Sequence, residues 1–166
     1  MDGKLVIRKA EIGDLIQITE IYNDAILKTT ATFDTEPKSS EEQAIWFANH
    51  DDKHPILVAE HDGTIVAWAS LSKWSDRCAY QDTAEISVYV LDGCRRRGIG
   101  KMLICEIIEV GHRVGLHTVI ARITEDNDMS IHLHESMGFK HVGTMKEVGK
   151  KFGKLLDVNI MQLIYD

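Results

Sequence analysis

The spacing of hydrophobic and polar positions changes along the chain, and each change marks a boundary between predicted elements. Strict alternation over residues 84–90 predicts a strand with one apolar and one polar face. Over residues 99–113 the apolar side chains instead recur every three or four residues, which predicts an amphipathic helix. An Asp-Gly pair at 62–63, between two apolar runs, predicts a tight β-hairpin.

Capping and turn signals predict the remaining elements. Ser39 and Glu42 have the spacing of a capping box at the start of one helix, and Asp14 is the expected cap of an earlier one. A short helix over 130–137 should end at Gly138. A closing hairpin should turn within 149–153. The other predicted strands cover 5–8, 56–60, 64–71, 117–123, 141–148 and 155–164. This order predicts a mixed α/β (α+β) fold with antiparallel pairs at both ends and one crossover in the middle.

Composition limits the class of protein. With 166 residues and 44% hydrophobic content, the chain should form one domain over residues 1–166. No apolar run approaches the ~18 residues of a membrane span, and no signal-peptide core is apparent. Three scattered cysteines indicate reduced thiols in the cytoplasm, and the role of Cys94 stays open. The net charge of −7 argues against nucleic acid as a partner.

A basic, glycine-containing segment lies between the strand 84–90 and the helix 99–113. It reads Arg95-Arg96-Arg97-Gly98-Ile99-Gly100-Lys101. Glycine lets the backbone approach a ligand closely, and the first N–H groups of a helix have no partner within it. The segment therefore predicts an anion site for a phosphorylated cofactor. Its spacing matches neither a P-loop, which needs Lys-Ser or Lys-Thr after the second glycine, nor a Rossmann fingerprint, which needs a third glycine.

Two motifs resemble the GNAT N-acetyltransferase superfamily. Arg95, Gly98 and Gly100 are spaced like its acetyl-CoA pyrophosphate loop, and the segment 127–139 is similar to a helix that follows in that superfamily. The resemblance implies a central, mostly antiparallel twisted sheet of about seven strands, flanked by about four helices and splayed between strands four and five. It implies acetyl-CoA as the acetyl donor, held by Val88, Tyr89, Val90, Arg95, Arg96, Arg97, Gly98, Ile99, Gly100, Lys101, Asn127 and Ser130.

Further segments resemble one branch of that superfamily, the phosphinothricin acetyltransferases and their relatives that act on methionine sulfone and sulfoximine. These segments are 35–37, 40–42, 83–90, 133–135, 147–153 and 156–158, so the similarity extends over nearly the whole chain. The resemblance implies acetylation of the α-amino group of a small amino-acid-like acceptor, by direct transfer within a ternary complex. It also suggests a homodimer. The physiological acceptor and the kinetic order stay open.

Two residues are the expected catalytic groups. Glu85 lies on the polar face of the strand 84–90 and matches the glutamate that phosphinothricin acetyltransferases use as a base. His134 occupies the position where many relatives have a tyrosine that protonates the leaving thiolate, although it could instead only hold the cofactor or a water. The His132-x-His134 pair lacks a third ligand with suitable spacing, so no metal is expected.

An acceptor pocket is expected beside the strand 84–90. Arg77 could hold a carboxylate or could be surface decoration, and Phe33 could close the pocket or belong to the core. The full candidate set is Phe33, Trp74, Arg77, Thr83, Glu85 and Tyr89. Two other functions compete. A protein N-terminal or lysine acetyltransferase would need an open peptide groove, whereas a non-catalytic CoA-binding module would not need both Glu85 and His134.

Overall fold

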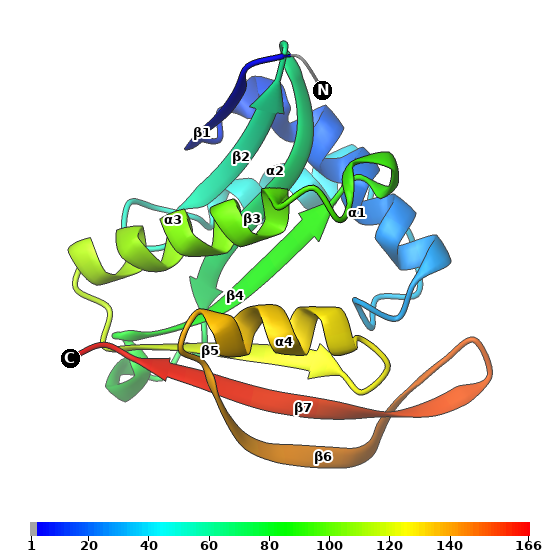
Figure 1. Cartoon of the computed structure of the whole chain (residues 1–166), viewed down its shortest axis with the longest axis vertical. Helices are drawn as coiled ribbons and strands as arrows, with labels where there is room; N and C mark the ends of the chain where they lie inside the picture. The colour runs from blue at the N-terminus through cyan, green and yellow to red at the C-terminus, as the bar shows by residue number, and fades with distance from the viewer. Residues whose placement is uncertain (1–2) are drawn as a thin grey trace.

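One seven-stranded sheet with helices on both faces makes up the computed structural model, which describes residues 3–166 (Figure 1). The strands are β1 (Leu5–Lys9), β2 (Ile56–His61), β3 (Thr64–Lys73), β4 (Thr83–Val90), β5 (Thr118–Thr124), β6 (Lys140–Lys151) and β7 (Lys154–Ile164). The helices are α1 (Leu15–Lys28), α2 (Ser40–Ala48), α3 (Ile99–Arg113) and α4 (Asp128–Ser136). The sheet order is β1-β2-β3-β4-β5-β7-β6, and only the β4–β5 pair is parallel. The predicted fold class is confirmed.

The two central strands separate soon after they meet. Parallel pairing of β4 with β5 covers only Thr83–Glu85 against Thr118–Ile120. Beyond it, β4 remains paired with β3 as far as Val90, whereas β5 pairs with β7 as far as Thr124. The facing edges of the two strands therefore diverge in the middle of the sheet, which frees backbone groups for a ligand.

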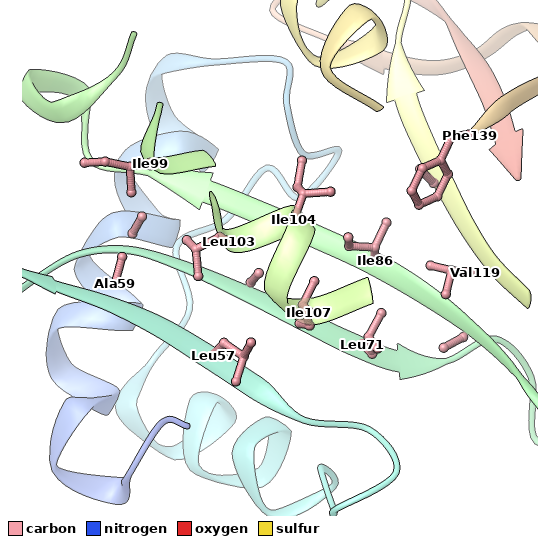
Figure 2. Close-up of a cluster of buried hydrophobic side chains, with 14 of the residues drawn as sticks. Leu57, Ala59, Leu71, Ile86, Ile99, Leu103, Ile104, Ile107, Val119 and Phe139 are labelled. Carbon is pink, nitrogen blue, oxygen red and sulfur yellow. The ribbon is translucent and has the colours of Figure 1, made fainter. Parts of the chain in front are cut away.

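The main core lies between the sheet and α3. Leu103, Ile104 and Ile107 on one face of α3 are fully buried against β2, β3 and β4 (Figure 2). Burying each such side chain contributes about 1.5–3 kcal/mol. A second cluster, which includes Ile18 and Trp68, packs α1 and α2 on the opposite face. The polar side chains of β4 consequently face α1 and α2, as the alternation of 84–90 predicts.

The start of α1 differs from the prediction. Asp14 is not a side-chain cap of α1; it ends a 3-10 turn, Ile12–Asp14, that Glu11 opens. Its carboxylate accepts hydrogen bonds from the backbone N–H of Glu11 at 2.8 Å and from both terminal nitrogens of Arg8 at 2.7 and 2.8 Å. The nearby guanidinium thus diverts the carboxylate from the helix. The other predicted cap is confirmed, because Ser39 and Glu42 form a reciprocal capping box.

The closing hairpin turns within the predicted segment 149–153, but only its last two residues form the turn. β6 continues to Lys151, and a two-residue turn at Phe152 and Gly153 has φ angles of +49° and +75°, the left-handed region. Gly149 lies within β6 and has a packing role instead. A Cβ atom there would lie 2.1 Å from the ring of Phe33, so the missing side chain makes room for that ring. The short helix α4 begins two residues earlier than predicted, with Asn127 as its cap, and Gly138 follows its end with φ of +92°.

Candidate active site

A long cleft of about 1110 Å³ runs along the start of α3, past the end of β4 and along α4. Of the twelve residues expected to hold acetyl-CoA, Arg97 alone does not line this cleft. The eleven that do are Val88, Tyr89, Val90, Arg95, Arg96, Gly98, Ile99, Gly100, Lys101, Asn127 and Ser130. We call this cavity the α3 cleft.

The start of α3 is open to an anion. Gly98 is the N-cap residue with φ of +79°, and it supplies no side-chain cap for the N–H groups of the first turn. No acidic residue lies in that turn. Arg95 is held beside the loop, because its guanidinium donates to the carbonyl of Val90 at 3.2 Å and pairs with Asp92 at 3.1 Å. Free N–H groups, the helix dipole and Lys101 together suit a phosphate group.

A second cavity of about 390 Å³ lies where β4 and β5 separate, and we call it the splay pocket. Glu85, Ser87 and Tyr89 line it from β4, and Phe33 lines it from the loop after α1. It shares Val88, Tyr89, Asn127, Ser130 and His134 with the α3 cleft. The two cavities therefore adjoin, and His134 lies at their junction.

Glu85 is paired with an arginine that the sequence analysis missed. Arg122 on β5 donates from Nε to Oε1 of Glu85 at 2.5 Å and from a terminal nitrogen to Oε2 at 2.8 Å. Donating these hydrogen bonds to the carboxylate of Glu85 raises the pKa of Arg122, which stays charged. Its guanidinium also lies 5.7 Å from the ring centre of Trp74. The sequence did contain a signal for this residue, because Arg122 is a single charged residue inside the otherwise apolar strand predicted over 117–123.

His134 is buried and is held by its own helix. Its Nδ1 lies 2.8 Å from the carbonyl oxygen of Ser130, which can only accept, so Nδ1 carries the hydrogen. The ring packs edge-on against Phe139. Burial lowers the pKa of His134 below its ordinary value, so Nε2 is an unprotonated acceptor at neutral pH. The predicted role as proton donor thus requires that Nε2 first receive a proton.

The buried His134 and the partly buried His50 should make stability decrease as the pH falls below about 6.5. Burial lowers the pKa of both His134 and His50, so the unfolded chain, with a histidine pKa of about 6.5, binds protons first as the pH falls. The contribution of each histidine to the free energy of unfolding is complete above about pH 6.5. Below that pH it decreases by up to about 1.4 kcal/mol for each pH unit. Urea unfolding at a series of pH values measures this slope. We expect His50→Gln and His134→Gln to reduce it, whereas the exposed His132→Gln should not; equal slopes in all three variants would contradict the assignment.

The structure brings only part of the predicted acceptor site together. Phe33, Glu85 and Tyr89 line the splay pocket. Trp74, Arg77 and Thr83 do not line it: Trp74 lies against Arg122, Arg77 is exposed, and Thr83 pairs with Thr118 at the base of β4. The cation in the pocket is Arg122, so a carboxylate role for Arg77 stays a prediction.

A helix start open to an anion beside a splayed sheet, with a carboxylate in the adjoining pocket, is the arrangement expected of an acyltransferase site. Residues 7–160 match the Acetyltransferase (GNAT) domain, and the chain belongs to this family. The predicted family is confirmed.

Named relatives are similar to nearly the whole chain. The L-methionine sulfoximine/L-methionine sulfone acetyltransferase of Salmonella typhimurium is 36% identical over 163 residues, covering 98% of this chain and 95% of the relative. The phosphinothricin N-acetyltransferase of Streptomyces coelicolor is 36% identical over 160 residues, covering 94% of each. The solved structure of a GNAT superfamily phosphinothricin acetyltransferase from Sinorhizobium meliloti, in complex with acetyl-CoA, has a TM-score of 0.92 at 35% identity. It covers 99% of this chain and 89% of that one.

Two kinds of feature are absent from residues 3–166. None of the helices there combines the length and apolar character needed to cross a bilayer. No cluster of three or more His, Cys, Asp or Glu side chains suited to a metal ion occurs in this part of the chain either.

Proposed function

We propose that the protein transfers the acetyl group of acetyl-CoA to the α-amino group of a small amino-acid-like acceptor, within one domain spanning residues 1–166. The observation that carries this proposal is the Glu85–Arg122 pair in the splay pocket, next to the α3 cleft. An amino acid carries an ammonium and a carboxylate on the same carbon. Glu85 can bind the ammonium of the acceptor, and Arg122 can bind its carboxylate. The pair therefore offers each charged group of an amino acid a partner of opposite charge. The named relatives support acceptors of the methionine sulfone, methionine sulfoximine and phosphinothricin type.

The α3 cleft offers positive charge and free backbone groups to acetyl-CoA. Arg96, Lys101 and the open N–H groups after Gly98 would hold the phosphates. The edge of β4 that β5 leaves free, at Val88 and Val90, would bind the main chain of the pantetheine arm. When bound, acetyl-CoA supplies an acetyl thioester that an amine can attack.

The two predicted catalytic residues can then share the protons that leave the nitrogen. An ammonium must lose two protons to become an amide nitrogen. Glu85 accepts the first and releases it to solvent, which generates the attacking amine. His134 accepts the second at Nε2 and passes it to the departing sulfur of coenzyme A. As the new C–N bond forms and the C–S bond breaks, the products are an N-acetyl compound, the free thiol and one proton in solution.

Assembly and location complete the proposal. We infer a cytoplasmic homodimer. Its support lies in β6, the edge strand of the sheet, which exposes Val142 and Val148, while Leu155 on the neighbouring β7 is exposed as well. Three free cysteines are consistent with a reducing compartment. Light scattering of the purified protein measures the oligomeric mass.

The decisive experiment compares acceptors. We expect thiol release from acetyl-CoA with methionine sulfone, methionine sulfoximine or phosphinothricin at a higher kcat/KM than with a mixed peptide panel. Arg122→Met should raise KM for the free acid about tenfold or more. It should raise KM for the corresponding amide much less, because only the acid has a carboxylate that Arg122 can bind.

The same two measurements on Arg77→Met decide between the two arginines. An acid-selective effect of Arg77→Met would move the carboxylate anchor to Arg77. If peptides are better acceptors than every free amino acid tested, the small-molecule function itself is wrong.

A further inference from the structure

A third cavity, of about 330 Å³, lies beside the splay pocket, between α1 and α2 on one side and β3 and β4 on the other. We call it the side cavity. It shares four lining residues with the splay pocket: Tyr22, Asp34, Ser87 and Tyr89. The two cavities therefore adjoin, and an acceptor held at Glu85 would lie next to the side cavity.

Two buried hydrogen-bond donors line the side cavity without a partner. Trp68 on β3 is 3% exposed and Gln43 on α2 is 4% exposed. The indole N–H of Trp68 and the carboxamide nitrogen of Gln43 make no hydrogen bond to any part of residues 3–166. Buried donors in proteins nearly always have an acceptor, and an oxygen of a ligand in the adjoining side cavity is a suitable one for both.

The charges around the side cavity are already engaged. The ammonium nitrogen of Lys38 lies 3.5 Å from a carboxylate oxygen of Asp34, and Asp34 also accepts a hydrogen bond from the hydroxyl of Tyr22. Glu42 accepts from the backbone N–H of Ser39 in the capping box of α2. Among residues 3–166, no unpaired cation lines the side cavity to balance an anion, so the two donors suit a neutral acceptor oxygen.

Four aromatic side chains line part of the side cavity, beside seven polar or charged residues. The ring of Trp68 lies 5.3 Å from Trp46, 4.9 Å from Tyr89 and 5.8 Å from Tyr22, measured between centroids. These rings can pack against a short methylene chain, and the polar side chains that line the rest of the cavity can contact a polar tip. A chain of this kind with a neutral oxygen at its tip is the side chain of a sulfone or sulfoximine amino acid.

We propose that the side cavity binds the acceptor's side chain and that Trp68 and Gln43 donate hydrogen bonds to its neutral terminal oxygen. This assignment rests on the proposed function and adds a specificity to it. Methionine sulfone should be a better acceptor than phosphinothricin, whose tail is charged, and better than norleucine, which has no tail oxygen.

Substitutions that remove one donor each test the assignment. Trp68→Phe and Gln43→Met should each lower the ratio of kcat/KM for methionine sulfone over that for norleucine by about tenfold. The double variant should lower it by about 100-fold. Gln81→Met makes the same chemical change at an exposed site outside the cavity and should leave the ratio unchanged. The acetyl-CoA affinity and unfolding midpoint of each variant report whether it is folded.

A measurement on the unaltered protein is independent of any folding defect. The NMR resonance of the Trp68 indole N–H should shift on saturation with methionine sulfone, and should shift less with norleucine. Unchanged acceptor ratios, equal shifts, or a preference for phosphinothricin would each overturn the side-chain assignment while leaving amino-acid acetylation intact. Failure of every free amino acid as an acceptor would instead refute the proposed function.

Discussion

Glu85→Gln is expected to lower kcat for a small amino-acid acceptor about 100-fold at pH 7, with the fold and the acetyl-CoA affinity retained. The amide cannot accept the proton that the acceptor must lose, but its carbonyl oxygen can still accept a hydrogen bond from Arg122, which is bonded to both carboxylate oxygens in the unaltered protein. Raising the pH supplies free amine without the help of a base. Part of the lost turnover should therefore return in alkaline buffer.

A matched control is available in another carboxylate–guanidinium pair of the sheet. Glu60 on β2 accepts from Arg8 at 2.8 Å, and neither residue lines a cavity described above. Glu60→Gln removes a comparable ion pair and should leave kcat unchanged. If Glu85→Gln keeps wild-type turnover across the pH range, Glu85 has no part in proton transfer.

The patterns that predicted the fold correctly depend on residues close together in the chain. Alternation over 84–90 separates Ala84 and Ile86, which are buried, from Glu85, which faces the splay pocket. The apolar stripe of 99–113 becomes the buried face of α3. Local periodicity is enough for such assignments, because the sheet and the helix each present one side to the core.

The predictions that failed, and the site residues that were missed, depend on contacts that the sequence does not display. Gly149 looked like a turn residue, but it accommodates the ring of Phe33, far away in the chain. Arg122 lies 37 residues from Glu85 and meets it only because β4 and β5 are neighbours at their base. The unpartnered N–H of Trp68 becomes recognisable only when α2 encloses it. The sequence thus shows which reactive side chains are present, whereas the fold is needed to show which of them contact one another.

The second large effect is expected at the start of α3. Gly98→Val should weaken acetyl-CoA binding about 100-fold, measured by calorimetry. Gly98 has φ of +79°, where a residue with a side chain is strained by about 1–2 kcal/mol, so the loop should shift to relieve the strain. A shift misaligns the N–H groups that face the phosphates, and each charge-assisted hydrogen bond is worth about 1.5–3 kcal/mol. A Cβ atom at Gly98 would have nothing within 4 Å, so the fold itself has room for the change.

Gly93→Val is the control for this substitution. Gly93 lies in the 3-10 turn Asp92–Cys94 just before the loop, and a Cβ atom there would also have nothing within 4 Å. It has no positive φ and does not line the α3 cleft, so its substitution should leave the dissociation constant of acetyl-CoA unchanged. The unfolding midpoint of Gly98→Val reports whether this variant is folded. If it is folded and still binds acetyl-CoA as tightly as Gly93→Val does, the phosphates do not bind at the start of α3. The assignment of the loop at 95–101 would then have to be abandoned, although the Glu85–Arg122 pair could still bind an acceptor.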